Sequence, residues 1–311
     1  MAPRIGLYLP TWPGRDGRNA GWDEIRTLAL EAEAAGAATL WVADHLQQVL
    51  PGRPAFGFWE CWTILTAAAA ATSRVEVGSF VLATAFRNPG LVAKMAATLD
   101  EVSGGRLILG LGSGDPAHDR SWESFGYDAP RAGSRHAEAV EVIARLFREP
   151  PVTFAGEFHR TSGAAILPPG PRRGGPPIWL AGKGSRTLAT AARWGDAVNV
   201  DHPIADAADA RAIVERARAA CEGVGRDPAT LAVTGWARVA FRDDGHAEPR
   251  PGWLGGSVAE LRTTVDAIAA AGVGHLTLYV GAADDPSPRP ALTRASLERV
   301  APLLEAVAPS G

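Results

Sequence analysis

A recurring unit, in which a helix ends at a glycine and a short apolar strand follows, runs through the whole chain. Three of its helix ends precede a strand by only a few residues: Ala35-Gly36, Trp194-Gly195 and Ala271-Gly272. Glycine after a helix readily takes the left-handed conformation that stops it. The strands are continuous apolar runs rather than alternating ones, as expected when both faces are covered. The pattern therefore predicts parallel strands connected by helices.

Counting these units gives eight strands and eight helices. The predicted strands are Ile5–Leu9, Thr39–Ala43, Val75–Val81, Leu107–Leu111, Ile178–Ala181, Ala197–Val200, Leu231–Phe241 and His275–Val280. The predicted helices are about Trp22–Ala35, Phe58–Thr72, Pro89–Val102, Gly133–Phe147, Ser185–Trp194, Asp206–Glu222, Val258–Ala271 and Leu292–Val307. Eight such units favour an α/β fold, a (β/α)₈ TIM barrel that forms one domain over residues 1–311. A doubly wound open sheet is the alternative, and it needs no pairing between the first and last strands.

Two long stretches without periodicity interrupt the repeat, at about residues 115–132 and 149–177. The first follows a strand directly, so we expect these insertions at the C-terminal, active-site face of the barrel. Its aromatic residues Trp122, Phe125 and Tyr127 form either a lid or ordinary loop packing. The second insertion begins with residues 152–158, which are typical of a small hairpin.

Composition excludes several classes of protein. The net charge of -3 offers no electrostatic footprint for nucleic acid, and no apolar stretch is long enough to span a bilayer. The N-terminal residues lack the apolar core of a signal peptide. The two cysteines, Cys61 and Cys221, show no disulfide spacing, and the histidines show no metal-ligand spacing. We therefore expect a bacterial, cytoplasmic protein with reduced thiols and no metal.

An acid and a histidine, Asp44 and His45, follow the strand Thr39–Ala43 without an intervening turn residue. Catalytic groups of a parallel barrel lie at the carboxyl ends of its strands. The structural alternative is that Asp44 caps the loop and that His45 is a core histidine with its hydrogen bonds satisfied. Burying either group without a partner is costly, so both alternatives require partners.

Two glycine-rich segments also follow strands. Gly182-Lys183-Gly184-Ser185 opens a helix, and its amides, the helix dipole and the lysine suit a phosphate, with Ser185 as a possible N-cap. The alternative is an ordinary turn with a solvated lysine. The second segment, residues 110–116, fails as a dinucleotide fingerprint because its third glycine comes too early. We expect Ser113 and Asp115 of this segment either to point into the mouth of the barrel or to cap the turn. Asp119 and His118, in the polar loop that follows, are expected to be solvated.

Several separated motifs, in order along nearly the whole chain, resemble those of the bacterial luciferase-like flavin- or deazaflavin-dependent oxidoreductases. They are Trp41-Val42-Ala43-Asp44-His45-Leu46, Phe58-Trp59-Glu60-Cys61-Trp62-Thr63, Phe86-Arg87-Asn88-Pro89, residues 94–100, Ser103-Gly104-Gly105-Arg106-Leu107, Gly110-Leu111-Gly112-Ser113-Gly114, residues 185–194 and the helix Val258–Ala271 with Gly272. The first two look most like the branch that uses coenzyme F420. The chain departs from related sequences at Asp115-Pro116, where a Trp-His-Glu-Pro segment or a glutamate is common, and at Ala83.

The resemblance implies a barrel with the deazaflavin ring at its mouth. Asp44 and His45 would lie beside the ring, with His45 as an acid/base candidate. Asp115 would match a carboxylate of the branch that uses F420. Strand three would bulge at Phe80-Val81, with a cis peptide, to back the ring. Ser113 and Gly114 would touch the cofactor. Its phosphate would be held by four residues: Gly182, Lys183, Gly184 and Ser185.

These residues predict an oxidoreductase that transfers a hydride between F420 and a small organic substrate, with His45, Asp44 and Asp115 as catalytic residues. The first alternative is an FMN-dependent monooxygenase that uses reduced flavin and O₂. The second is a flavin-binding barrel without turnover. Aromatic residues in the mouth loops favour an apolar or aromatic substrate, and the resemblance implies a homodimer.

Overall fold

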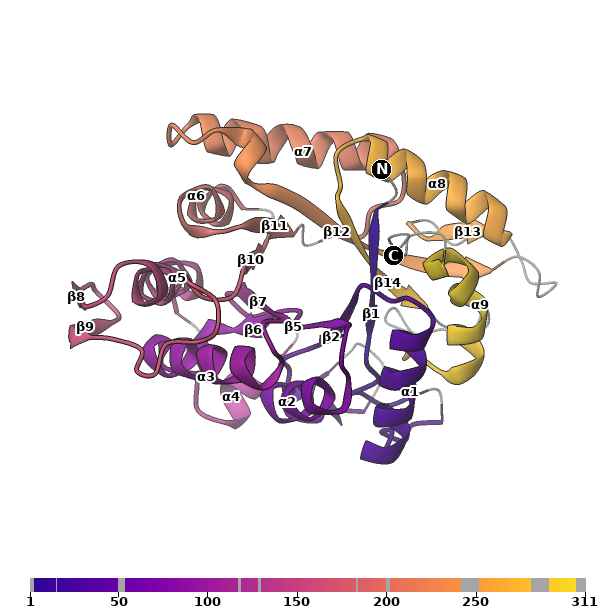
Figure 1. Cartoon of the computed structure of the whole chain (residues 1–311), viewed down its shortest axis with the longest axis horizontal. Helices are drawn as coiled ribbons and strands as arrows, with labels where there is room; N and C mark the ends of the chain where they lie inside the picture. Colours follow the sequence, from indigo (N-terminus) through magenta and orange to yellow (C-terminus); the bar gives the residue numbers. More distant parts are fainter. Residues whose placement is uncertain are drawn as a thin grey trace.

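The computed structural model describes residues 3–14, 16–49, 54–116, 119–127, 130–182, 184–199, 202–241, 252–280 and 291–305. Its centre is a closed barrel of eight parallel strands (Figure 1). In chain order these are β1 (Arg4–Tyr8), β2 (Thr39–Val42), β5 (Glu76–Ser79), β7 (Leu107–Gly112), β10 (Ile178–Ala181), β11 (Ala197–Asn199), β12 (Ala232–Phe241) and β14 (His275–Val280). The first strand pairs with the last, β1 with β14. This closure confirms the TIM barrel and excludes the open doubly wound sheet.

The barrel is surrounded by the helices that connect its strands (Figure 1). They are α1 (Trp22–Ala34), α2 (Cys61–Ala71), α3 (Pro89–Val102), α5 (Ala132–Arg148), α6 (Ser185–Trp194), α7 (Ala207–Glu222), α8 (Val258–Ala270) and α9 (Arg294–Glu305). All eight predicted strands and all eight predicted helices are therefore present, although residues 200, 306 and 307 at predicted ends lie outside the described residues. The helix predicted from Phe58 begins later, because Glu60 caps it by accepting the backbone N–H groups of Trp62 and Thr63.

The third strand of the barrel is interrupted where the bulge was predicted. β5 ends at Ser79, the Phe80–Val81 peptide bond is cis, and the chain resumes as β6 (Leu82–Ala83), which also pairs with β7. A short 3₁₀ helix, η1 (Thr84–Phe86), follows and leads to α3. The bulge and the cis bond are confirmed.

Short elements occupy the connections between the main ones. The first insertion contains α4 (Ser121–Ser124), and the second contains the hairpin of β8 (Val152–Ala155) and β9 (Arg160–Ala164), which runs further than predicted. The hairpin lies at the outside of the barrel beyond α5 (Figure 1). The others are β3 (Gln47–Gln48), β4 (Phe56–Gly57), η2 (Pro228–Thr230) and β13 (Leu254–Gly256).

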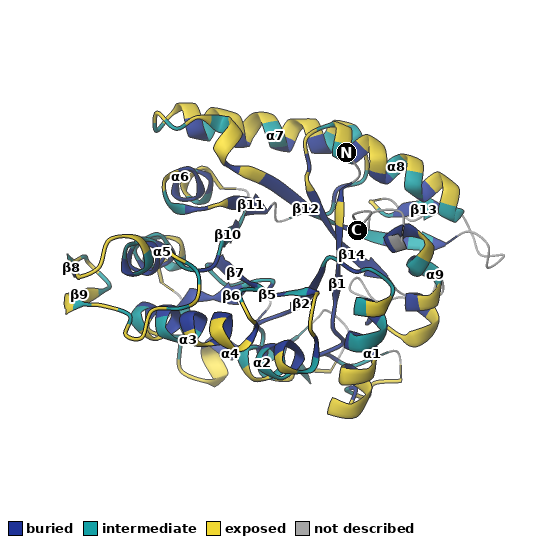
Figure 2. Cartoon of the chain, in the orientation of Figure 1, coloured by how far each residue is buried: buried dark blue, intermediate teal, exposed yellow. Residues whose placement is uncertain are grey.

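Two apolar cores lie on the two sides of the strands, which are buried along almost their whole length (Figure 2). The outer core, between strands and helices, is aliphatic, as at Leu40, Leu109 and Ile143. The inner core fills the lumen with aromatic side chains, at Tyr8, Trp12, Trp41 and Tyr279, with Phe80, Trp179 and Trp236 against them. Barrel interiors are more often filled by branched aliphatic residues, so this lumen is unusually rich in rings.

Glycines on neighbouring strands make room for the largest of these rings. A Cβ atom on Gly6 or on Gly78 would lie 2.3 or 2.2 Å from the indole of Trp41. No side chain fits at such a distance, so the two glycines leave room for the indole of Trp41 on both neighbouring strands, β1 and β5. Trp41 is fully buried there.

Two findings bear on the compositional predictions. No helix among the described residues is long and apolar enough to cross a membrane. Cys61 and Cys221 are both free thiols in the interior.

Candidate active site

The carboxyl ends of the strands, which we call the mouth of the barrel, bring together three of the predicted site segments. His45 follows β2, Asp115 follows β7, and Gly182 follows β10. Since all eight strands run parallel, their ends meet at one side of the barrel. The predicted placement of these segments at one face is therefore confirmed.

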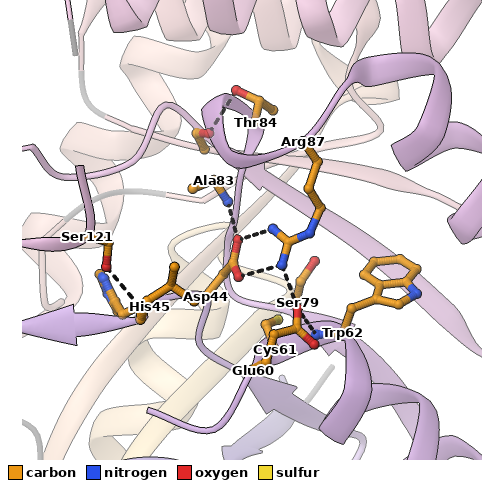
Figure 3. Close-up of polar contacts among 12 residues, drawn as sticks. Asp44, His45, Glu60, Cys61, Trp62, Ser79, Ala83, Thr84, Arg87 and Ser121 are labelled. Atoms are coloured by element: carbon orange, nitrogen blue, oxygen red, sulfur yellow. Dashed lines mark hydrogen bonds and ion pairs between the residues drawn. The ribbon is translucent and has the colours of Figure 1, made fainter. Parts of the chain in front are cut away.

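The carboxylate of Asp44 is fully buried and fully engaged. Arg87 donates to both of its oxygens, from Nη1 to Oδ2 at 2.7 Å and from Nη2 to Oδ1 at 3.0 Å. The backbone N–H of Ala83 donates a third hydrogen bond to Oδ2 at 2.8 Å (Figure 3). A two-pronged contact between guanidinium and carboxylate is the strongest geometry for such a pair. Asp44 thus ties the end of β2 to the resumed third strand.

Glu60 completes this ion-pair network from the start of α2. Its Oε1 accepts from Nη2 of Arg87 at 2.6 Å, while both oxygens cap the helix (Figure 3). Burial disfavours the charge on Arg87, but the hydrogen bonds and charge of Asp44 outweigh it and raise the pKa of Arg87. Burial also disfavours the charge on Glu60 and so raises its pKa. Hydrogen bonds from Thr63, Trp62 and Arg87 outweigh this effect, and the pKa of Glu60 lies below its usual value.

His45 is held by a carboxylate that the sequence analysis expected to be solvated. Nδ1 of His45 lies 2.8 Å from Oδ2 of Asp119, whose side chain is only 2% exposed. The other oxygen of Asp119 accepts the backbone N–H of Ser121 at 2.8 Å. The solvated interpretation of Asp119 is wrong, because β2 and the first insertion meet at the mouth. His118 lies outside the described residues.

The loop that carries His45 is fastened to the same insertion. The hydroxyl of Ser121 accepts the backbone N–H groups of Leu46 and Gln47, at 3.1 and 2.9 Å. Gln48 forms an isolated antiparallel bridge with Asp119. The ring of Phe58 lies 5.1 Å from that of His45. His45 is therefore fixed between a polar wall and an aromatic one.

The predicted ring-backing residues lie between the mouth and the lumen. Phe80 is half-buried and makes edge contacts with Tyr8 and Trp41, at 5.3 and 5.2 Å between ring centroids. Val81, on the other side of the cis bond, is half-buried as well. These two residues leave part of their apolar surface exposed at the end of the aromatic lumen that faces the mouth.

The segment after β7 is half-buried at Ser113, Gly114 and Asp115. Gly114 has a φ of 82°, and a Cβ there would lie 2.6 Å from the ring of Trp122. The backbone carbonyl of Asp115 accepts the N–H of Asp119 at 2.9 Å. This turn therefore delivers Asp119 to His45.

The predicted phosphate segment follows β10. Gly182 has a φ of 147° and lies against Thr187, where a Cβ would come within 2.9 Å. The residue in the N-cap position is Gly184 and not Ser185, which is the first helical residue, and no side chain caps this helix. The suggested N-cap role of Ser185 is therefore wrong. Space is open around Gly184, and Lys183 lies outside the described residues.

The arrangement suits proton transfer beside a planar apolar ligand. Among the described residues, no group of three or more histidine, cysteine or acidic side chains could hold a metal ion. Uncapped amide groups at the start of α6 favour an anion there. A histidine with a carboxylate partner lies at the mouth, and an aromatic wall lies beside it.

Three residues of this site were not predicted from the sequence. Arg87 and Glu60 lie within the family-like motifs without a predicted role, and Asp119 was expected to be solvated. One signal was available: a buried Asp44 must have a cationic partner, and Arg87 stands a few residues after the third strand, within the Phe86-Arg87-Asn88-Pro89 motif.

The chain is similar to proteins of a known family. A family model described as luciferase-like monooxygenase matches residues 4–248. An F420-dependent glucose-6-phosphate dehydrogenase of Kineococcus radiotolerans is 34% identical over 182 residues, which are 56% of this chain and 50% of that protein. An F420-dependent hydroxymycolic acid dehydrogenase of Mycobacterium tuberculosis is 31% identical over 215 residues, 67% of this chain and 56% of that protein. The chain thus matches about half the length of these curated relatives.

A solved structure supports the fold. An F420-dependent secondary alcohol dehydrogenase superposes with a TM-score of 0.78, over 99% of each chain, at 18% identity. At that identity, the likeness concerns the architecture of the barrel.

Proposed function

The chain belongs to the luciferase-like monooxygenase family, and from this membership we propose that it is an F420-dependent oxidoreductase acting on a small organic substrate. One observation carries the choice of cofactor: curated relatives at 31–34% identity are named as F420-dependent dehydrogenases. The pairing of His45 with Asp119 supports the chemistry, because a hydride transfer that changes the charge of the substrate needs a proton partner.

Several features of the mouth fit a deazaflavin. A planar ring would lie against Phe80 and Val81, with Ser113 and Gly114 along its edge. Its phosphate would meet Gly182, Lys183, Gly184 and Ser185, where the helix is uncapped and space is open. When bound, F420 would supply the hydride chemistry, and the protein would orient it and exclude water.

His45 is the proposed acid/base. A histidine ring can both accept and donate a proton, and the side chain of this one is 16% exposed at the mouth. Asp44, which the sequence analysis put among the catalytic residues, is better assigned to positioning, since Arg87 and Ala83 occupy its oxygens. Asp115 stays a candidate for a second proton-transferring group beside His45.

Three broader features belong to the same proposal. The aromatic residues around the mouth, such as Phe56 and Phe58, favour an apolar or aromatic substrate. Residues 1–311 act as one domain, since strands from both ends of the described chain close one barrel. We also propose a homodimer in the cytoplasm, where free thiols such as Cys61 stay reduced.

The test is to purify the protein from a host that makes both flavins and deazaflavins and to identify the retained cofactor by mass spectrometry. Reduced and oxidised F420 and FMN are then supplied separately with a panel of substrates. Retention of F420 and turnover without O₂ consumption are expected. Binding of reduced FMN with substrate-dependent O₂ consumption would replace the proposal by the monooxygenase alternative. Bound cofactor without any redox change over the panel would favour the binding barrel.

A further inference from the structure

The contact between His45 and Asp119 indicates which ring nitrogen of His45 carries the proton. Oδ2 of Asp119 lies 2.8 Å from Nδ1 of His45, and the carboxylate is buried. Burial raises the pKa of Asp119, but hydrogen bonds from His45 and Ser121 outweigh it and lower the pKa below the usual value. Since an ionised carboxylate only accepts hydrogen bonds, the proton of this contact belongs to Nδ1.

Gln48 lies against the same ring. Its amide nitrogen lies 3.2 Å from Nε2 of His45 and 3.3 Å from Nδ1. Because the two distances are almost equal, this contact does not distinguish the two ring nitrogens, and the position of the proton follows from Asp119 alone.

The far side of the carboxylate is fixed as well. Oδ1 of Asp119 accepts the backbone N–H of Ser121, which itself holds the loop of His45 through Leu46 and Gln47. The imidazole and the carboxylate are therefore carried by one hydrogen-bonded unit, although they lie 74 residues apart in the sequence.

We propose that Asp119 is a positioning residue that keeps the proton of His45 on Nδ1 and leaves Nε2 to exchange a proton with the substrate. The proposal rests on the proposed function for the role of Nε2. The assignment of the proton itself does not, because it concerns the protein without cofactor or substrate. A carboxylate that orients a catalytic imidazole in this way also stabilises the imidazolium that forms during turnover.

The decisive variant is Asp119→Asn. Its amide oxygen is held by the N–H of Ser121, because turning the amide over would place two N–H donors against each other. The amide NH₂ then faces Nδ1 of His45 and requires that nitrogen to accept. We therefore expect the proton to move to Nε2, while the side chain keeps its shape.

The measurement is the ¹⁵N spectrum of protein labelled in histidine, without cofactor, in which the two ring nitrogens differ in shift and in their couplings to ring protons. The signals of His45 are identified by their loss in His45→Gln. We expect a proton on Nδ1 in the wild type and on Nε2 in Asp119→Asn. A proton on Nε2 in the wild type, or no change in the variant, would overturn the proposal.

Kinetics give the second readout. We expect kcat of Asp119→Asn to fall by a factor of about 10²–10⁴, with KM little changed, because the loss concerns proton transfer and not binding. The matched control is Asp206→Asn, which changes the same atoms at the N-cap of α7, where asparagine caps equally well. It should keep both kcat and the wild-type signals of His45.

The two readouts separate this proposal from the proposed function. If no substrate is turned over but the proton lies on Nδ1 and moves in Asp119→Asn, the positioning role holds and the reaction needs revision. If the variant turns over at the wild-type rate, Asp119 has no part in proton transfer. Should Asp119→Asn not fold, the spectrum of the wild type alone still decides where the proton lies.

Discussion

The lumen of the barrel and its mouth each hold a histidine, and the two are treated in opposite ways. His275, at the start of β14, is 3% exposed and lies among Trp41 and Trp179, at 5.8 and 5.1 Å between rings. Neither of its ring nitrogens has a hydrogen-bond partner among the described residues. Burial, with a smaller effect of Arg4, lowers its pKa to about 3. His45, at the mouth, has a carboxylate and an amide beside its ring.

This difference shows what makes a histidine useful. An imidazole without a partner in an apolar lumen stays neutral at any physiological pH and serves packing. The same side chain at the strand ends gains a partner that can stabilise the protonated ring. The lumen contains rings that fill space, whereas the mouth contains charges that are paired. The following predictions test that contrast, from the largest expected effect to the smallest.

Replacing His45 at the mouth should have the largest effect on activity. We expect His45→Ala to lower kcat by a factor of about 10²–10⁴, because a general acid/base is lost. The affinity for the cofactor should change little. The control is His159→Ala on the hairpin, which should keep the wild-type kcat. Full activity of His45→Ala would remove the proposed acid/base role.

Replacing Arg87 should have the largest effect on stability. Arg87→Met leaves Asp44 buried without a cation, and we expect a loss of about 3–5 kcal/mol in the free energy of unfolding. Denaturant titration measures this loss. The control is Arg18→Met, whose ion pair with Glu24 is exposed, so this variant should unfold at nearly the same denaturant concentration as the wild type. Equal losses in the two variants would contradict the distinction.

The lumen histidine should appear in the pH dependence of stability. Burial lowers the pKa of His275 to about 3 and that of His136, in α5, to about 4, and it lowers the pKa of His159 by a smaller amount. Below about pH 6.5 the unfolded chain binds protons that the folded chain does not. The contribution of these histidines to the free energy of unfolding is therefore fully present above pH 6.5. It falls as the pH falls, by about 1.4 kcal/mol per pH unit for each fully buried histidine.

Denaturant titrations between pH 5 and 6.5 measure this slope, above the range where carboxylates such as Glu60 titrate. In His275→Leu, the slope of the free energy of unfolding against pH should decrease by the amount that corresponds to one proton. In His45→Ala, the part of the slope that comes from His275 should remain. An unchanged slope in His275→Leu would mean that His275 does not stay neutral in the folded lumen.

The smallest expected effect concerns the edge of the ion-pair network. Glu60→Ala removes the cap of α2 and one hydrogen bond to Arg87, but the side chain of Glu60 is 41% exposed. We expect a loss of about 1 kcal/mol in the free energy of unfolding, and a kcat close to that of the wild type. A loss as large as that of Arg87→Met would show that Glu60, too, is required to hold Asp44.

Much of the fold was predictable because its signals are local. Apolar runs and glycines at helix ends, such as Gly36 and Gly272, marked all eight units, and strand ends placed His45 and Gly182 at the mouth. The partners were not predictable in this way. Arg87 lies 43 residues beyond Asp44, and Asp119 lies in a polar loop whose composition suggests exposure.

By itself the sequence determined the barrel, the strand after which His45 stands, and the bulge at Phe80-Val81 that its family resemblance implied. Only the tertiary structure decided which carboxylate faces the imidazole and which one is neutralised by Arg87. The physical reason is that patterning reports on how each segment meets water, whereas a hydrogen bond requires two atoms to approach within about 3 Å. Residues 45 and 119 come that close because the barrel closes and brings their loops to the same end.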